Sequence, residues 1–187
     1  MGTTPDRLPP GPLTYEDYVE LPDDGKRYEI LDGELFVSPA PTPRHQRVLF
    51  NLASKLREHA RDRQLGEILV SPIDLILAPT IIAQPDILFI RVGRESSVTE
   101  RAIEAAPELV IEILSPSTGR RDRTTKAKLY ARFGVPYYWL LDPGERTFEG
   151  YRLADGEYRV SVRKRGDQTV SADPFPELTI MLGELWA

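Results

Sequence analysis

Two acidic residues lie in segments of the sequence that are otherwise apolar. Glu112 is the only charged residue in LVIEILS (109–115), and Asp86 follows a proline at the start of PDILFI (85–90). Both segments are too short for helices and are rich in branched residues, which predicts strands. An ionised carboxylate in such a strand costs several kcal/mol unless it meets a cation. Adjacent strands could therefore bring the two carboxylates to a shared cation.

A lysine is predicted to face the same interior. The segment RDRTTKAKLYARF (121–133) has a helical period, in which Lys126 lies at the centre of the apolar stripe whereas Lys128 faces water. Asp122, four residues before Lys126, lies on the same side and can hold the ammonium. Two carboxylates and an ammonium facing one interior suit a metal-dependent site for phosphodiester hydrolysis. Taken singly, each has a structural explanation, since a buried carboxylate can be salt-bridged and a lysine can reach solvent along its aliphatic stem.

Two further acidic residues lie on a predicted β-hairpin near the N-terminus. Asp32 and Gly33 separate two alternating segments and supply the positive φ that a type I′ turn requires. With a two-residue loop, Glu29 and Glu34 share one face of the hairpin. That face is either solvated or turned toward the site.

A histidine lies on the apolar face of the helix that follows. Thr42 is an N-cap candidate and Pro43 suits the first helical position, so a helix is predicted from about residue 43 to 63. His45 lies at the centre of the apolar stripe formed by Val48, Leu49, Leu52, Leu56 and Ala60. His45 is therefore either a hydrogen-bonded core residue or a supporting residue of the site.

A particular order of elements must position these residues. The first predicted elements are a short helix capped by Thr14, with Tyr15, Tyr18 and Val19 inward, then the hairpin and the helix 43–63. Strands follow at 67–77, 85–90 and 109–115, then the helix 121–133 ending at Gly134 and a strand at 135–143. The chain ends with a hairpin at 147–162, turning near Asp155-Gly156, and a tail whose apolar residues close the core: Phe175, Leu178, Ile180, Leu182 and Trp186. This order predicts an α/β (α+β) fold, a central mixed β-sheet flanked by helices with N-terminal and C-terminal β-hairpins. Residues 1–13 are predicted to form a disordered leader and residues 14–187 a single domain.

Composition excludes several classes of site. The 187 residues include no cysteine and two histidines, which excludes disulfides, thiolate zinc sites, a cysteine nucleophile and a three-histidine metal site. The sequence has no GxSxG, Walker or GxGxxG motif. It also has no stretch of about 18 consecutive apolar residues and no signal-like N-terminal segment, so we expect a cytoplasmic protein without a membrane segment.

The net charge of −5 argues against a nucleic-acid partner unless positive charge is gathered locally. Residues 120–132 contain six basic residues against one acidic residue, and residues 44–63 contain six against two. Either segment is a solvated helix face or a surface that contacts phosphates, in which case affinity falls steeply with salt.

Five segments together resemble a known family. They are YEILDGEL, SPAPTPRHQRV, QPDILF, PELVIEILSPST and RRDRTTKAKLYARFGVPYYWLLDP. They resemble the Uma-type family of restriction endonucleases, in the PD-(D/E)XK nuclease superfamily, from about Thr14 to the C-terminus. The resemblance implies a restriction-endonuclease-like central mixed sheet flanked by helices.

The resemblance also implies roles for individual residues. Asp86 and Glu112 match the metal-binding carboxylates, and the backbone carbonyl of Ile113 completes the metal shell. The superfamily pattern has a lysine where this sequence has Leu114, and Lys126 matches the position of a lysine relocated to the neighbouring helix. The remaining expected site residues are Glu29 as a catalytic residue, His45, Glu34 and Asp122 as supporting residues, and Arg120, Arg121 and Arg123 as nucleic-acid contacts.

The expected function is a metal-dependent endodeoxyribonuclease. Mg²⁺ is the expected cofactor, with Mn²⁺ as a substitute, because the predicted ligands are all oxygen. DNA is the expected partner, and a homodimer is expected because a duplex cut requires two active sites or two encounters. The main alternative is a catalytically decayed nuclease fold that acts as a nucleic-acid or protein interaction module. A third class, a protein for a small phosphorylated or anionic molecule, suits the acidic composition better but has no motif to support it.

Overall fold

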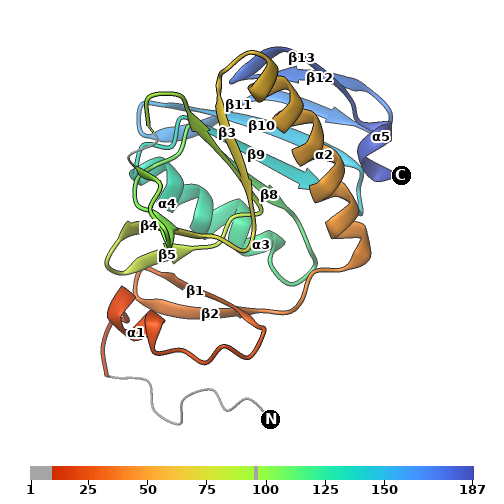
Figure 1. The fold of residues 1–187 in the computed structure, drawn as a ribbon. Helices are drawn as coiled ribbons and strands as arrows, with labels where there is room; N and C mark the ends of the chain where they lie inside the picture. The colour runs from red at the N-terminus through yellow and green to blue at the C-terminus, as the bar shows by residue number, and fades with distance from the viewer. Residues whose placement is uncertain (1–9, 95–96) are drawn as a thin grey trace.

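The computed structural model describes residues 10–94 and 97–187 (Figure 1). Its helices are α1 (Tyr15–Val19), α2 (Pro43–Asp62), α3 (Gly119–Arg121), the π-helical turn η2 (Asp122–Lys126), α4 (Ala127–Arg132) and α5 (Gly183–Trp186). Residues 1–9 of the predicted leader 1–13 lie outside the described residues. Within its last part, Leu13 is buried and its amide donates to the carbonyl of Gly33, so the packed chain includes Leu13.

The strands form three sheets. They are β1 (Arg27–Leu31), β2 (Glu34–Ser38), β3 (Gly66–Val70), β4 (Asp74–Ala78), β5 (Ile81–Ala83), β6 (Ile87–Arg91), β7 (Ala102–Ile103), β8 (Leu109–Ile113), β9 (Tyr137–Asp142), β10 (Thr147–Ala154), β11 (Glu157–Arg165), β12 (Thr169–Ala172) and β13 (Phe175–Met181). The sheet orders are β11-β10-β9-β8-β6-β3, β2-β1-β5-β4-β7 and β12-β13. The predicted mixed α+β fold is confirmed, with β8 antiparallel to β6 and parallel to β9.

The six-stranded sheet is buried on both faces in its central strands. Alternate residues of β6, β8 and β9 enter two different apolar clusters. One cluster includes the inward face of α2 and the tail with α5, and the other includes Leu129 and Tyr130 of α4. Because side chains alternate along a strand, Glu112 shares its face with Val110, which packs in the cluster of α4. The sheet therefore turns Glu112 toward the helix that carries Lys126.

The turns of both predicted hairpins are confirmed, and so is the predicted register of the first. Asp32 and Gly33 have φ of 53° and 80°, and Glu29 lies opposite Phe36. The second hairpin turns at Asp155-Gly156 and extends to Arg165, beyond the predicted end at residue 162. In the tail, Phe175, Ile180 and Leu182 are buried, with Leu178 and Trp186 packed against the same core, as predicted.

The prediction of one strand over residues 67–77 is wrong. This segment contains two strands, β3 and β4, which belong to different sheets and are joined across the cis peptide Ser71-Pro72. The short strands β5 and β7 were not expected, because two or three residues carry no detectable period. The predicted inward position of Val19 is also wrong, since this side chain is 52% exposed at the end of a one-turn helix.

The helical segment before β9 has a π-helical turn at its centre. It begins at Gly119 rather than at residue 121, and η2 separates α3 from α4. Lys126 and Asp122 are nevertheless both buried and Lys128 is exposed, as predicted. The segment ends where expected, because Gly134 has a φ of 75° and the amide of Val135 donates to the carbonyl of Tyr130. π-Turns of this kind are frequently found at functional sites.

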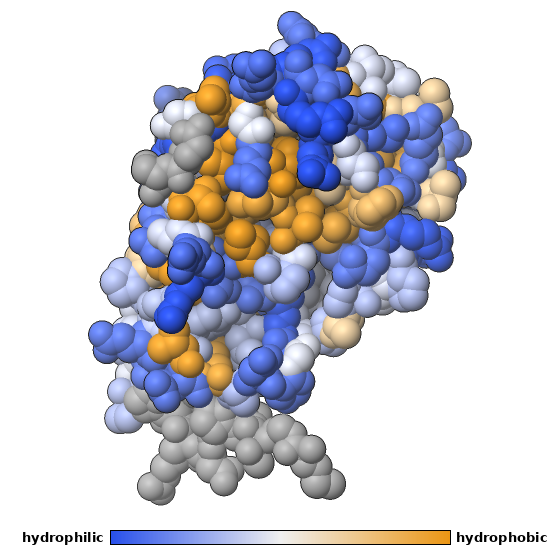
Figure 2. Space-filling model, viewed as in Figure 1, coloured by the Kyte–Doolittle hydropathy of each residue, from blue (hydrophilic) through white to orange (hydrophobic). Residues whose placement is uncertain are grey.

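One edge of the six-stranded sheet carries an apolar surface. Figure 2 shows an apolar area over β3 and the adjoining part of α2. Phe50 of α2 is 70% exposed and Val70 of β3 is 42% exposed. Across the described residues, no helix is both long and apolar enough to cross a membrane.

Candidate active site

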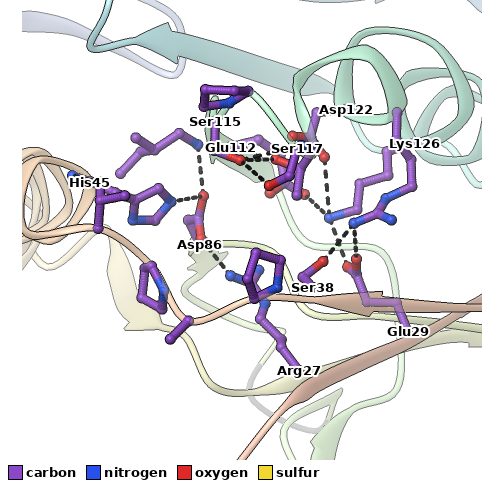
Figure 3. A pocket seen from close by; sticks show the side chains of 18 residues that line it. Arg27, Glu29, Ser38, His45, Asp86, Glu112, Ser115, Ser117, Asp122 and Lys126 are labelled. Carbon is purple, nitrogen blue, oxygen red and sulfur yellow. Dashed lines mark hydrogen bonds and ion pairs between the residues drawn. The ribbon is translucent and has the colours of Figure 1, made fainter.

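Most of the charged residues singled out in the sequence converge on one cavity (Figure 3). The cavity has a volume of about 170 Å³ and lies between the β1–β2 hairpin, the start of α2, the end of β8 and the helical segment 119–132. Its ionisable lining residues are Arg27, Glu29, His45, Asp86, Glu112, Arg121, Asp122 and Lys126. The predicted burial of Asp86, Glu112 and Lys126 is confirmed, since each is only 2% exposed.

Asp86 is held on both of its carboxylate oxygens. Its Oδ2 accepts a hydrogen bond from the amide of Ile113 at 2.7 Å and lies 3.1 Å from Nε2 of His45. Its Oδ1 lies 3.0 Å from Nη1 of Arg27. Burial by itself raises the pKa of Asp86, but the hydrogen bond from His45 and the charge of Arg27 outweigh it and hold the pKa below its ordinary value. Asp86 is therefore an ionised carboxylate.

Lys126 lies at the centre of a carboxylate cluster. Its Nζ is 2.7 Å from Oε1 of Glu29, 2.8 Å from Oε1 of Glu112 and 3.6 Å from Oδ1 of Asp122. Tyr130, one helical turn after Lys126, donates its hydroxyl to the same Oε1 of Glu112 at 2.9 Å. The ammonium is thus surrounded by carboxylate oxygens.

The protonation states follow from burial and charge together. Burial, together with the charges of the neighbouring carboxylates, raises the pKa of Glu112 to about 8 despite the opposing effect of Lys126. Burial by itself lowers the pKa of Lys126, but the charges of Glu112, Glu29 and Asp122 outweigh it and raise the pKa above its ordinary value. Lys126 is therefore an ammonium at neutral pH and cannot accept a proton from water.

The two acidic residues of the N-terminal hairpin have different positions. Glu29 is 1% exposed, accepts a hydrogen bond from the amide of Gln84 at 2.9 Å and contacts Lys126. Glu34 is exposed and does not line the cavity. Glu34 lies opposite Leu31, whereas Glu29 lies opposite Phe36, two residues farther from the turn. Two residues along a strand span about 6.6 Å. At that distance from Glu29, the same face of the hairpin is outside the cavity.

The three arginines predicted as nucleic-acid contacts are not equivalent. Arg121 lines the cavity, where its Nη2 donates to Oγ of Ser38 at 2.7 Å and lies 3.3 Å from Oε2 of Glu29. Arg123 forms an ion pair with Glu149 at 2.8 Å. Arg120 is exposed. Two of the three guanidinium groups are thus already paired with carboxylates of the chain.

Arg27, Gln84 and Tyr130 were not singled out in the sequence. Arg27 had a detectable signal, because residues two apart on a strand share a face and Arg27 is two residues before Glu29. Tyr130 also had a detectable signal, because it lies four residues after Lys126, on the inward side of the helix. Gln84 contributes backbone groups from a loop between β5 and β6, and no side-chain pattern reveals such a contact.

The carboxylates of the cavity are suitable ligands for the divalent cation that the resemblance implies. Among the described residues, no group of three or more acidic or histidine side chains is arranged as a metal site. The cavity nevertheless contains four carboxylates and three basic side chains, which leaves one negative charge in excess when all are ionised. Oδ1 of Asp122 is buried without a hydrogen-bond donor. An all-oxygen carboxylate set with excess negative charge fits a hard divalent cation in chemistry and charge.

Comparisons with known proteins found a family model, a relative and a solved structure that match this chain. The family model Uma2, described as "Putative restriction endonuclease", matches residues 15–183. An uncharacterized protein of Synechocystis sp., sll1609, is 29% identical over 135 residues, which cover 70% of this chain and 75% of that protein. A crystal structure from Anabaena variabilis, described as a putative nuclease belonging to DUF820, superposes with a TM-score of 0.76 at 23% identity. That match covers 94% of this chain and 98% of the other, and it shows a shared fold.

Proposed function

This chain belongs to the Uma2 family, described as "Putative restriction endonuclease", and from that premise we propose that it hydrolyses DNA phosphodiester bonds in the cavity around Asp86, Glu112 and Lys126. The observation that carries the proposal is the distance of 2.8 Å between Nζ of Lys126 and Oε1 of Glu112 in a cavity that also contains Asp86. An ammonium beside one carboxylate, in a cavity that contains a second, is the arrangement expected for stabilising a phosphate that gains charge during hydrolysis.

The lysine comes from the helix and not from β8. Leu114 occupies the position where the superfamily pattern has a lysine, and it packs in the apolar cluster of α4. Lys126 enters the cavity from the end of the π-turn η2 and reaches Glu112 from the helix side. We therefore assign to Lys126 the role of the relocated lysine.

Asp86 and Glu112 would hold a divalent cation, with the backbone carbonyl of Ile113 as the third protein ligand. Mg²⁺ is the preferred ion and Mn²⁺ a substitute, because carboxylate and carbonyl oxygens are hard ligands. When bound there, such a cation supplies an activated water and offsets the charge of the phosphate.

The remaining residues position these groups. The amide of Ile113 and the ring of His45 fix Oδ2 of Asp86, and Glu29 and Asp122 hold the ammonium of Lys126 from two further sides. Because Lys126 keeps its proton, its role is to bind a phosphate oxygen as a cation and not to act as a general base.

DNA as substrate, a homodimer and a cytoplasmic location are parts of the same proposal. A double-strand cut requires two active sites or two encounters, and a dimer supplies two sites. The site is also balanced for an anionic substrate: four carboxylates, three basic side chains and one divalent cation leave a single positive charge, which one phosphodiester neutralises.

A second candidate function is a binding module in which the same fold no longer cleaves. The observation that favours it is the state of Asp86, whose two oxygens both meet donors of the chain itself. Such a module would bind nucleic acid or protein without a requirement for metal.

Plasmid cleavage in Mg²⁺ and Mn²⁺ tests the proposal. Asp86→Asn, Glu112→Gln and Lys126→Met are each expected to lower the rate by about 10²–10³-fold, the usual effect of removing a group that stabilises the transition state. Glu34→Gln is the matched control, because it removes a carboxylate of the same hairpin outside the cavity, and it should cleave like the wild type. Full activity of Asp86→Asn would remove this residue from the site. A wild-type protein that binds DNA but cleaves none with either metal would favour the binding module.

A further inference from the structure

Arg27 occupies the oxygen of Asp86 that a divalent cation would need. Oδ2 of Asp86 is fixed by the amide of Ile113 at 2.7 Å and by His45 at 3.1 Å, and both groups belong to rigid elements, β8 and α2. Oδ1 is the other oxygen, and Nη1 of Arg27 lies 3.0 Å from it. The contact that a cation would have to replace is therefore the one made by Arg27.

A guanidinium and a divalent cation at this oxygen repel each other. A bound cation lies about 2.0–2.6 Å from its oxygen ligands, inside the distance at which Arg27 now lies. The two groups would then be like charges in contact within a buried cavity, where repulsion is only weakly screened. Occupancy of Oδ1 by one group thus weakens binding of the other.

Arg27 also has few other contacts and has space to move. It is the first residue of β1, and its side chain is 20% exposed, in contrast to the 3% of Asp86. Its second anchor is the backbone carbonyl of Gln84, while its Nε has no hydrogen-bond partner among the described residues. Arg27 lines a second cavity of about 630 Å³ as well, on the side of Lys26 and Gln46. The side chain can therefore leave Asp86 without unfolding a strand.

We propose that Arg27 is a positioning residue that holds Asp86 in the absence of metal, competes with the divalent cation for Oδ1, and is released when the cation binds. This inference rests on the proposed function, since it requires the cation to bind at Asp86. Once released, the guanidinium remains at the wall of the cavity, where it can bind an oxygen of the substrate phosphate. Metal binding and substrate binding are then coupled through one side chain.

Metal affinity provides a readout that does not depend on cleavage. Titration of Mn²⁺ into the metal-free protein, followed by calorimetry, compares Arg27→Gln with Arg121→Gln. Both changes remove one positive charge from the same cavity, but Arg121 contacts Glu29 and Ser38 and not Asp86. Competition predicts that Arg27→Gln raises the affinity for Mn²⁺ by about tenfold or more, on the scale of changes next to metal ligands. Arg121→Gln should raise it much less.

Arg27→Lys provides a second variant that keeps the charge. A lysine ammonium has a single charged nitrogen and cannot contact Asp86 and the Gln84 carbonyl as the two-nitrogen fork does. Its affinity for Mn²⁺ should lie between those of the wild type and Arg27→Gln. If Arg27→Gln does not fold, as judged by circular dichroism, Arg27→Lys against Arg121→Lys gives the same comparison.

The outcomes separate this inference from the proposed function. Equal effects of Arg27→Gln and Arg121→Gln would show that charge alone matters, and a lower affinity in Arg27→Gln would show that Arg27 supports the site; either result overturns the inference. Asp86→Asn is the third arm of the titration. If it binds Mn²⁺ like the wild type, the metal is not held by Asp86 and the proposed function fails as well. If it loses Mn²⁺ while the two arginine variants behave alike, only the competition is overturned.

Discussion

At the scale of single residues, Lys126 is the most constrained side chain of the site. It is 2% exposed and is surrounded by Glu29, Glu112 and Asp122, so it has no route to water along its stem. Buried ion pairs of this kind add little net stability, but removing one partner leaves the others charged and unpaired. The same side chain is therefore required for the fold of the cavity and for its chemistry.

Lys126→Met is expected to lower the free energy of unfolding by about 3–5 kcal/mol, because two or three buried carboxylates lose their cation. The double variant Lys126→Met/Glu112→Gln should lose less than the sum of the two single variants, since the amide removes one of the unpaired charges. Urea denaturation in the absence of metal and above pH 8, where Glu112 is ionised, measures all three values. Strict additivity would show that Lys126 and Glu112 do not interact energetically.

Glu112 is expected to make stability depend on pH. Its pKa is about 8 in the folded protein, above its ordinary value of 4.5, because burial disfavours the ionised form. Between these two values the folded protein holds a proton that the unfolded chain has released, so the free energy of unfolding falls as the pH rises through this range and then levels off. The glutamine of Glu112→Gln cannot titrate.

Urea denaturation of the wild type and Glu112→Gln at several pH values, in the presence of a chelator, tests this prediction. The stability of Glu112→Gln relative to the wild type should increase with pH up to about 8 and then remain constant. A relative stability that does not change with pH would indicate that Glu112 is ionised throughout.

At the scale of elements, the site depends on how two strands and two helices end. Asp86 lies just before β6, Glu112 lies in β8, and the two strands are antiparallel with Ile87 opposite Ile111. On the helix side, the cap of Thr42 fixes the start of α2 through the amide of His45, at 3.2 Å. Turn and cap residues determine where such elements end. Substitution of a glycine that needs a positive φ therefore tests how strictly an end is fixed.

Gly66→Ala and Gly134→Ala make a matched pair of substitutions. Both glycines have positive φ, 146° and 75°, but a Cβ at Gly66 would meet the carbonyl oxygen of Ile90 and lie 2.9 Å from Cα of Arg91, whereas a Cβ at Gly134 meets nothing. Gly134→Ala should therefore cost only the backbone term, about 1–2 kcal/mol. Gly66→Ala should cost clearly more, since β3 must move away from β6. Thermal unfolding measures both, and equal losses would contradict the steric argument.

At the scale of the whole molecule, the net charge is negative, but unpaired basic residues are unevenly distributed over the surface. Arg121 and Arg123 are paired with carboxylates, whereas Arg44, Arg47 and Arg57 of α2 are exposed and have no carboxylate partner among the described residues. The helix α2 begins at the cavity, because Thr42 and His45 line it. The exposed side of α2 is thus a basic surface next to the cavity.

Arg47→Ala is expected to weaken binding to duplex DNA and to lower the slope of log affinity against log salt by about one, as the loss of one phosphate contact does. Arg123→Ala is the matched control and should change this slope little, because its guanidinium is already paired with Glu149. Fluorescence anisotropy with labelled DNA, without divalent metal, measures both slopes. If Arg123→Ala lowered the slope more than Arg47→Ala, the DNA contacts would belong to the segment 120–123 and not to α2.

Much of the local structure was predictable from the sequence. The Asp32-Gly33 turn fixed the register of the first hairpin, and the cap of Thr42 with the period of the following residues located α2. The same periods placed Asp86, Glu112 and Lys126 in the interior, where they are found. Turn chemistry and periodicity are local properties, so a sequence can carry them without knowledge of the fold.

Only the tertiary structure decided which groups meet. It divided the segment 67–77 between two sheets, left Glu34 in solvent, and placed Arg27 on Asp86 and Arg121 on Glu29. These outcomes depend on contacts between residues that are 59 and 92 positions apart in the chain. A periodic pattern indicates that a charge is buried, but the partner that compensates it comes from another strand or helix. The sequence by itself therefore determined which charges enter the interior, and the packing of the sheets determined the ion pairs that they form there.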